Sequence, residues 1–104
     1  MDLYLAKPAE IVTQVCTRLR TERLARQMTQ AELAARAGIG VNTVSNLEAG
    51  RNVGFETLVR VAMVLGRADE LQNLFLPKVD TLQDVLRYEE TGRRQRIRKG
   101  SHNA

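Results

Sequence analysis

The stretch Thr29–Arg51 constrains the fold of this chain more than any other, because it specifies two short helices and the turn between them. Thr29 followed three residues later by Glu32 forms a capping box, which marks the start of a helix. Gly38 can adopt the left-handed conformation that ends this first helix. A second helix is predicted over residues 41–49. Two short helices joined by a glycine-containing turn form a helix-turn-helix motif.

The predicted second helix has two unlike faces. At about 100° per residue, Val44 and Leu47 fall on one side and suit burial against the first helix. The other side is small, polar and uncharged, as a surface must be if it is to enter a DNA groove. Asparagine can contact adenine through two hydrogen bonds, and valine can meet a thymine methyl group. The predicted base contacts are Val41, Asn42, Ser45 and Asn46. The alternatives are phosphate or water contact for the polar residues and packing for the valine.

The segments TQAELA, AGI, NTVSNLEAGR and ETLVRVAMVLG together resemble the Cro/CI-type (XRE) family of bacterial and phage DNA-binding repressors. The resemblance covers about residues 11–74. It implies an all-α, five-helix, lambda-repressor-like domain that binds double-stranded DNA as a homodimer on an inverted repeat. Gly40 departs from the family, which usually has Ser or Thr as the cap of the recognition helix. The expected DNA-phosphate contacts are Thr29, Gln30, Thr43, Arg51 and Asn52.

An arginine interrupts the apolar face of the first predicted helix, residues 8–26. Arg23 continues the apolar positions 11, 15 and 19 in steps of four, and a buried charge needs a partner. Glu48 is the expected partner, and the resemblance implies the same ion pair. The alternative is that Arg23 reaches solvent from the helix end. The face expected to be buried comprises Ile11, Val12, Val15, Cys16 and Leu19.

Helices are also predicted over residues 55–65 and 69–76, with Pro77 closing the second. The core is expected to be aliphatic, with Phe55 and Phe75 as its two large rings. Asp80 or Thr81 can cap one further short helix, which Gly92 is expected to end. The chain therefore divides into an N-terminal lead (1–7), a DNA-binding domain (8–77), a helical extension (78–92) and a disordered basic tail (93–104).

The extension is too short to fold alone, so its apolar side must cover its own domain or a partner subunit. A homodimer interface is expected around Leu71, Phe75, Leu82 and Leu86. Residues 1–90 contain eleven Lys/Arg and twelve Asp/Glu, whereas the last fourteen residues contain five basic residues and no acidic residue. These residues can attract DNA phosphate regardless of sequence, or contact a protein partner, or simply be solvated. They are Arg93, Arg94, Arg96, Arg98 and Lys99.

Several classes of protein do not fit the sequence. A single cysteine allows no intrachain disulfide and suits a reducing cytoplasm. There is no signal peptide and no apolar run long enough to span a bilayer. The sequence holds no Cys/His dyad, no metal-ligand cluster and no glycine-rich phosphate loop, so neither an enzyme nor a cofactor is expected.

Three functions remain. The first is an autoregulatory transcriptional repressor in the cytoplasm of a bacterial or phage-infected cell. The second is an antitoxin, since the short extra helix and arginine-rich end look like the HipB-type antitoxins that accompany HipA-like kinase toxins. The third is a controller protein of a restriction–modification system. The gene next to this one discriminates between them.

Overall fold

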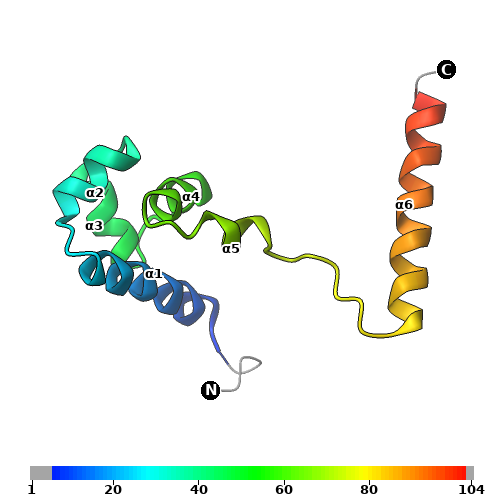
Figure 1. Ribbon diagram of the computed structural model, residues 1–104, viewed down its shortest axis with the longest axis horizontal. Coiled ribbons are helices and arrows are strands. Elements are labelled where there is room, and N and C mark those ends of the chain that lie inside the picture. Colours follow the sequence, from blue (N-terminus) through cyan, green and yellow to red (C-terminus); the bar gives the residue numbers. More distant parts are fainter. Residues whose placement is uncertain (1–5, 103–104) are drawn as a thin grey trace. The chain divides into compact units, whose positions relative to one another are not determined.

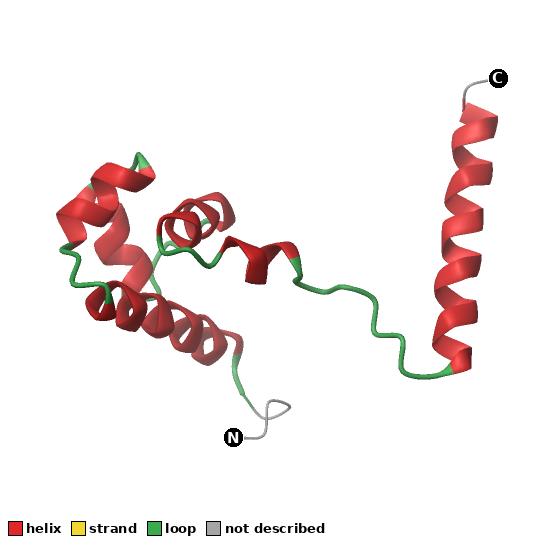
Figure 2. Cartoon of the chain, viewed as in Figure 1, coloured by secondary structure: helices red, strands yellow, loops and turns green. Residues whose placement is uncertain are grey.

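Six helices make up the chain in a computed structural model that describes the backbone of residues 6–102 and the side chains of residues 6–96 (Figures 1 and 2). Of the predicted N-terminal lead, residues 1–5 lie outside this description. The helices are α1 (Pro8–Ala25), α2 (Gln30–Ala37), α3 (Val41–Glu48), α4 (Phe55–Val64), α5 (Ala68–Gln72) and α6 (Leu82–His102). The described backbone contains no strand, as the all-α prediction requires.

The chain separates into two units, one ending at Gln72 and one beginning at Asn73. The division falls earlier than the boundary that was expected after Pro77. The helix α5 ends at Gln72 instead of continuing to residue 76, and the two units divide at the same point.

The first unit is held together by an aliphatic core shared by α1 to α4. Its innermost side chains have almost no solvent exposure, and each comes from the apolar face of its helix. They are Cys16 from α1, Leu33 from α2, Val44 and Leu47 from α3, Val61 from α4, and Leu65 just after it. Burying several Leu and Val side chains provides the main driving force for folding this unit.

The local signals around α2 act as predicted. The Thr29 hydroxyl accepts a hydrogen bond from the Glu32 backbone N–H at 3.0 Å, and the Glu32 carboxylate accepts one from the Thr29 N–H at 3.3 Å. Gly38 ends α2 with φ +70°, the left-handed conformation. Gly40 precedes α3 and provides no side-chain cap.

Both phenylalanines lie outside the core, which corrects the prediction. Phe55 is 65% exposed and Phe75 is 95% exposed. Phe55 is the first residue of α4, one turn ahead of the residues that face the core. Phe75 follows α5 with φ +56°, which no α-helix accommodates, so the predicted helix over residues 69–76 could not have held it.

Only the second half of the apolar face of α1 is buried. Cys16 is buried and Leu19 is half-buried, whereas Ile11, Val12 and Val15 are 37–41% exposed. The 18 residues of α1 extend past the 8-residue helices α2 and α3, so its first turns have less to pack against. The prediction of a continuous buried face was therefore wrong for the first half of the helix.

The second unit contains α6, which is much longer than the predicted short helix. The Thr81 hydroxyl accepts a hydrogen bond from the Asp84 N–H at 3.1 Å and so caps the helix. Gly92 was expected to end it, but the helix runs to His102, so residues 93–102 are helical. A glycine inside a helix costs about 1 kcal/mol relative to alanine. The ion pair between Glu90 and Arg94, at 2.7 Å, spans the glycine and offsets part of this cost.

Candidate nucleic-acid interface

The helix-turn-helix is formed by α2, the turn at residues 38–40, and α3. Val44 and Leu47 on the inner side of α3 are 0% and 1% exposed, and they fix the rotation of this helix about its axis. Ile39 is half-buried at the corner and packs against the same core. Once the inner side is fixed, the residues on the opposite arc of α3 must face outward.

The outer edge of α3 consists of the four residues that the sequence predicts to contact bases. Val41 is 46% exposed and Asn42 is exposed, while Ser45 and Asn46 are half-buried one turn further along. Within the part of the chain whose side chains are described, these side chains form no hydrogen bond or ion pair. The two amides and the hydroxyl can therefore bond to an external group. We refer to these four residues as the recognition edge.

A buried ion pair holds the end of α3 against α1. Arg23 donates from Nε to Glu48 Oε2 at 2.7 Å and from Nη2 to Oε1 at 3.0 Å, which is a bidentate contact. The side chains of Arg23 and Glu48 are only 7% and 3% exposed. Arg23 Nη1 also donates to the Met28 carbonyl oxygen at 2.7 Å. This is the pairing that the sequence analysis expects, and the extra bond to Met28 ties the α1–α2 connection to it.

Gln30 joins this network, which the sequence did not suggest. Its Nε2 donates to Glu48 Oε1 at 3.0 Å, so the start of α2 is bonded to the end of α3. An amide NH₂ has two hydrogens, and the second stays available to a DNA phosphate. Neither helical periodicity nor spacing indicates this contact, because it depends on how α2 and α3 pack in three dimensions.

The other expected phosphate contacts lie before, within and after the recognition edge in sequence. Thr29 is exposed at the start of α2, and its hydroxyl can still donate a hydrogen bond while accepting one from Glu32. Thr43 is half-buried on α3. Arg51 and Asn52 are exposed in the loop after α3, where the Arg51 N–H donates to the Asn46 carbonyl at 2.8 Å. That bond ends α3 and sets the course of the loop.

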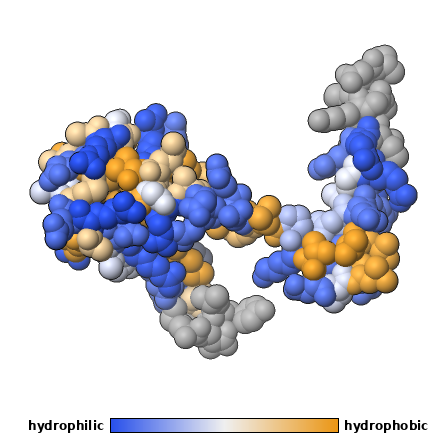
Figure 3. Space-filling model, viewed as in Figure 1, coloured by the Kyte–Doolittle hydropathy of each residue, from blue (hydrophilic) through white to orange (hydrophobic). Residues whose placement is uncertain are grey.

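The residues expected at a dimer interface are divided between the two units. Leu71 is half-buried on α5 in the first unit. In the second unit, Phe75, Leu82 and Leu86 are 95%, 74% and 55% exposed. Figure 3 shows apolar surface gathered at the start of α6. The second unit itself therefore leaves Phe75, Leu82 and Leu86 largely exposed.

The basic residues expected in a tail lie instead on α6. Arg93, Arg94 and Arg96 are exposed, and Arg94 pairs with Glu90. The side chains of Arg98 and Lys99 lie outside the described residues. Five basic residues are therefore carried on a helix, which fixes their spacing along an axis.

Other kinds of site have little support among the described residues. Among the residues that the structure describes, no three His, Cys, Asp or Glu side chains gather as metal ligands would. None of the described helices combines the length and apolar character that crossing a membrane requires. Cys16 is buried in the core, and burial raises the pKa of its thiol.

Comparison with known proteins gives one family match. A helix-turn-helix family model matches residues 19–71, from the second half of α1 to α5. The matched region contains the recognition edge and the Arg23–Glu48 pair. No curated protein sequence matches the chain.

Proposed function

Because this chain belongs to the Cro/CI-type (XRE) family of helix-turn-helix DNA-binding transcription regulators, we propose that it is a repressor of its own operon. It binds a specific inverted repeat in double-stranded DNA as a homodimer. The observation that carries the proposal is the recognition edge, which is turned outward, uncharged and free of internal hydrogen bonds among the described side chains. A helix edge of small residues can approach the bases closely in the major groove.

The recognition edge favours particular bases. Asn42 and Asn46 each present a carboxamide that can bond to adenine N6 and N7. Val41 is exposed and offers its methyl groups to a thymine methyl. The edge has no Arg, Lys or Gln for the common contacts to guanine, so we expect A·T pairs at the positions it reads. Each good contact contributes about 1–3 kcal/mol of discrimination.

Contacts to the DNA backbone set the register of the complex. Thr29 and Gln30 stand at the N-terminus of α2, where the helix dipole attracts phosphate. Thr43, Arg51 and Asn52 contact the phosphates that flank the groove. Gln30 is already oriented by its bond to Glu48, so the buried ion pair and the DNA contact act on the same side chain.

A single short helix reads only a few base pairs, so we propose that two copies bind together. Dimers with this motif read half-sites about one helical turn apart. The exposed Phe75, Leu82 and Leu86, with Leu71 on α5, are the proposed contacts between the copies. Covering these side chains removes apolar surface from water, which favours association.

A second candidate function is supported by the separate second unit. An antitoxin of the HipB type represses its own operon and also binds a HipA-like kinase toxin. The helix α6 belongs to a unit of its own and has exposed apolar side chains, so it offers a surface for such a protein. A gene for a HipA-like kinase beside this one, together with co-purification of its product, would support this function.

The repressor proposal is tested by footprinting the purified protein on the DNA upstream of its own gene. We expect two protected half-sites about one helical turn apart, related by inversion and containing A·T pairs. Uniform protection without a preferred site, at moderate salt, would contradict specific binding and leave only electrostatic attraction.

A further inference from the structure

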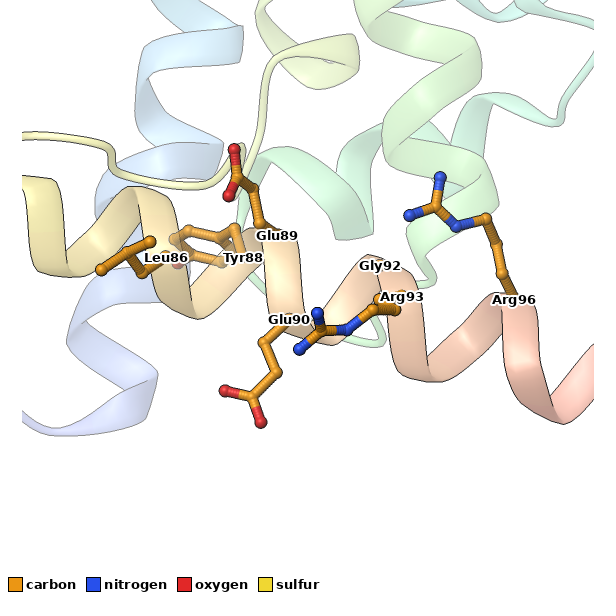
Figure 4. A pocket seen from close by; sticks show the side chains of 7 residues that line it. All are labelled: Leu86, Tyr88, Glu89, Glu90, Gly92, Arg93 and Arg96. Carbon is orange, nitrogen blue, oxygen red and sulfur yellow. The ribbon is translucent and has the colours of Figure 1, made fainter.

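One face of α6 carries its charges in separate blocks. Along the helix, Leu86 is followed by the carboxylates of Glu89 and Glu90 and then by the guanidinium groups of Arg93 and Arg96, and Figure 4 shows these side chains in that order. Positions 86, 89, 93 and 96 are spaced by three or four residues, so they form one stripe. They line a groove together with Tyr88, Glu90 and Gly92, which also belong to α6.

Three of these charges have no partner in the described chain. Glu90 is paired with Arg94, and Asp84 with Arg87, both inside the helix. By contrast, Glu89, Arg93 and Arg96 form no ion pair or hydrogen bond among the residues with described side chains. The stripe therefore presents a free carboxylate and two free guanidinium groups next to an exposed leucine.

We propose that this stripe pairs with the same stripe of a second copy, with the two α6 helices antiparallel. The proposal rests on the homodimer of the proposed function and specifies one of its interfaces. When the two stripes face each other with Thr91 of both copies at the same level along the helices, Glu89 of each copy faces Arg93 of the other. Symmetry produces this ion pair twice. In the same register, the aliphatic stem of Arg96 from one copy covers Leu86 of the other.

The distribution of charge favours this arrangement over the alternatives. Parallel helices in register would place Glu89 against Glu89 and Arg93 against Arg93, and like charges repel. A DNA duplex would attract the arginines but repel the carboxylates on the same stripe. Only a partner with the reverse order of charges satisfies both blocks, and a second copy running in the opposite direction has that order.

The antiparallel pair is also compatible with the spacing of DNA half-sites. At a rise of about 1.5 Å per residue, the two Leu82 residues would lie roughly 27 Å apart along the helices. Residues 73–81 connect each α6 to its DNA-binding unit. Half-sites about one helical turn apart are separated by roughly 34 Å, which these connections can bridge. The pairing is weak because the stripe is mostly polar, and binding of both units to one duplex raises its effective concentration.

The test measures self-association of the full chain by analytical ultracentrifugation, without DNA. Glu89→Arg and Arg93→Glu each replace two attractions by two repulsions. We expect each to raise the dimer dissociation constant at least about tenfold. Arg94→Glu serves as the control, because it makes the same charge change as Arg93→Glu at a position outside the stripe. It should change the dimer dissociation constant less than about threefold. Circular dichroism checks that α6 stays helical.

Mixing the two variants separates contacts between chains from contacts within one chain. In a mixed dimer, the arginine introduced at position 89 of one variant would face the glutamate introduced at position 93 of the other. Association should therefore return to within about threefold of the wild type. If the substitutions acted by breaking an ion pair within one α6 helix, mixing the two variants would not restore association.

Three results would overturn the proposal: unchanged association of both single variants, failure of the mixture to associate, or a wild-type chain that is monomeric without DNA. If the wild-type chain is monomeric without DNA and α6 binds the product of the neighbouring gene, the stripe is a contact for that protein instead. Footprinting of the operator stays a separate test of the repressor function, because it can succeed with copies that meet only on DNA.

Discussion

Replacing Arg23 by leucine should strongly destabilise the first unit. The substitution removes the two hydrogen bonds to Glu48 and the one to the Met28 carbonyl. Glu48, whose side chain is 3% exposed, would retain only the bond from Gln30. Leaving a buried charge without its partner costs about 3–5 kcal/mol. That is a large fraction of the total stability of a small domain, about 5–15 kcal/mol.

The cost should come from the orphaned carboxylate and not from the loss of the arginine itself. The double variant Arg23→Leu/Glu48→Leu removes both charges and fills part of their volume with apolar atoms. Replacing a buried ion pair in this way is often close to neutral. We therefore expect the double variant to be more stable than Arg23→Leu by at least about 1–2 kcal/mol.

Urea unfolding followed by circular dichroism measures these differences. Arg18→Leu is the matched control, because Arg18 is exposed on the same helix and its loss should change stability by less than about 0.5 kcal/mol. If Arg23→Leu does not fold, recovery of folding in the double variant still tests the reasoning. An Arg23→Leu variant with the wild-type free energy of unfolding would refute it, and so would a double variant no more stable than Arg23→Leu.

Three further predictions concern other parts of the molecule. Gly38→Ala should destabilise by about 1 kcal/mol because Gly38 has φ +70°, while Gly92→Ala, inside α6 and with no atom near the added methyl group, should not destabilise; a Gly38→Ala variant that melts at the wild-type temperature would contradict the strain argument. Removing residues 97–104, and with them Arg98 and Lys99, should weaken binding to operator and to unrelated DNA alike and lower the slope of log affinity against log salt concentration by up to about two ions per copy of the chain; an unchanged slope would mean that these residues do not contact phosphate. Cys16 is 1% exposed and burial raises the pKa of its thiol, so a thiolate-selective reagent at pH 8 should label it only as fast as the chain opens; rapid labelling of the native protein would show that this part of the core is not closed.

The parts of the fold that could be predicted from sequence are those set by local chemistry. The capping box at Thr29 and Glu32 and the left-handed Gly38 are decided within a few residues, so the limits of α2 and α3 follow from them. The helical period of α3 then separates Val44 and Leu47 from the recognition edge. The position of Arg23 in an apolar stripe predicts that it needs a buried partner, and the family resemblance agrees in assigning that partner as Glu48.

The features that the sequence does not predict have a different cause, because they depend on the residues that surround a helix and not only on the helix's own sequence. The exposure of Val15 and Phe55 depends on how far the neighbouring helices reach, and helical periodicity holds no information on this. The sequence predicts too short an α6 because a glycine usually ends a helix. A glycine with helix-forming neighbours and an ion pair across it stays helical. The bond from Gln30 to Glu48 is a tertiary contact between separate helices, and no local pattern encodes it.

The central claim, that the recognition edge reads base pairs, is tested most directly by the specificity of Asn46→Ala. Asn73→Ala is the matched control, because it makes the same change at an exposed position in the second unit. Affinities for the footprinted operator and for a scrambled duplex are measured at one salt concentration. We expect Asn46→Ala to lose about 1–3 kcal/mol of affinity for the operator and almost none for the scrambled duplex. Equal losses on both duplexes, or no loss on either, would contradict base reading by α3.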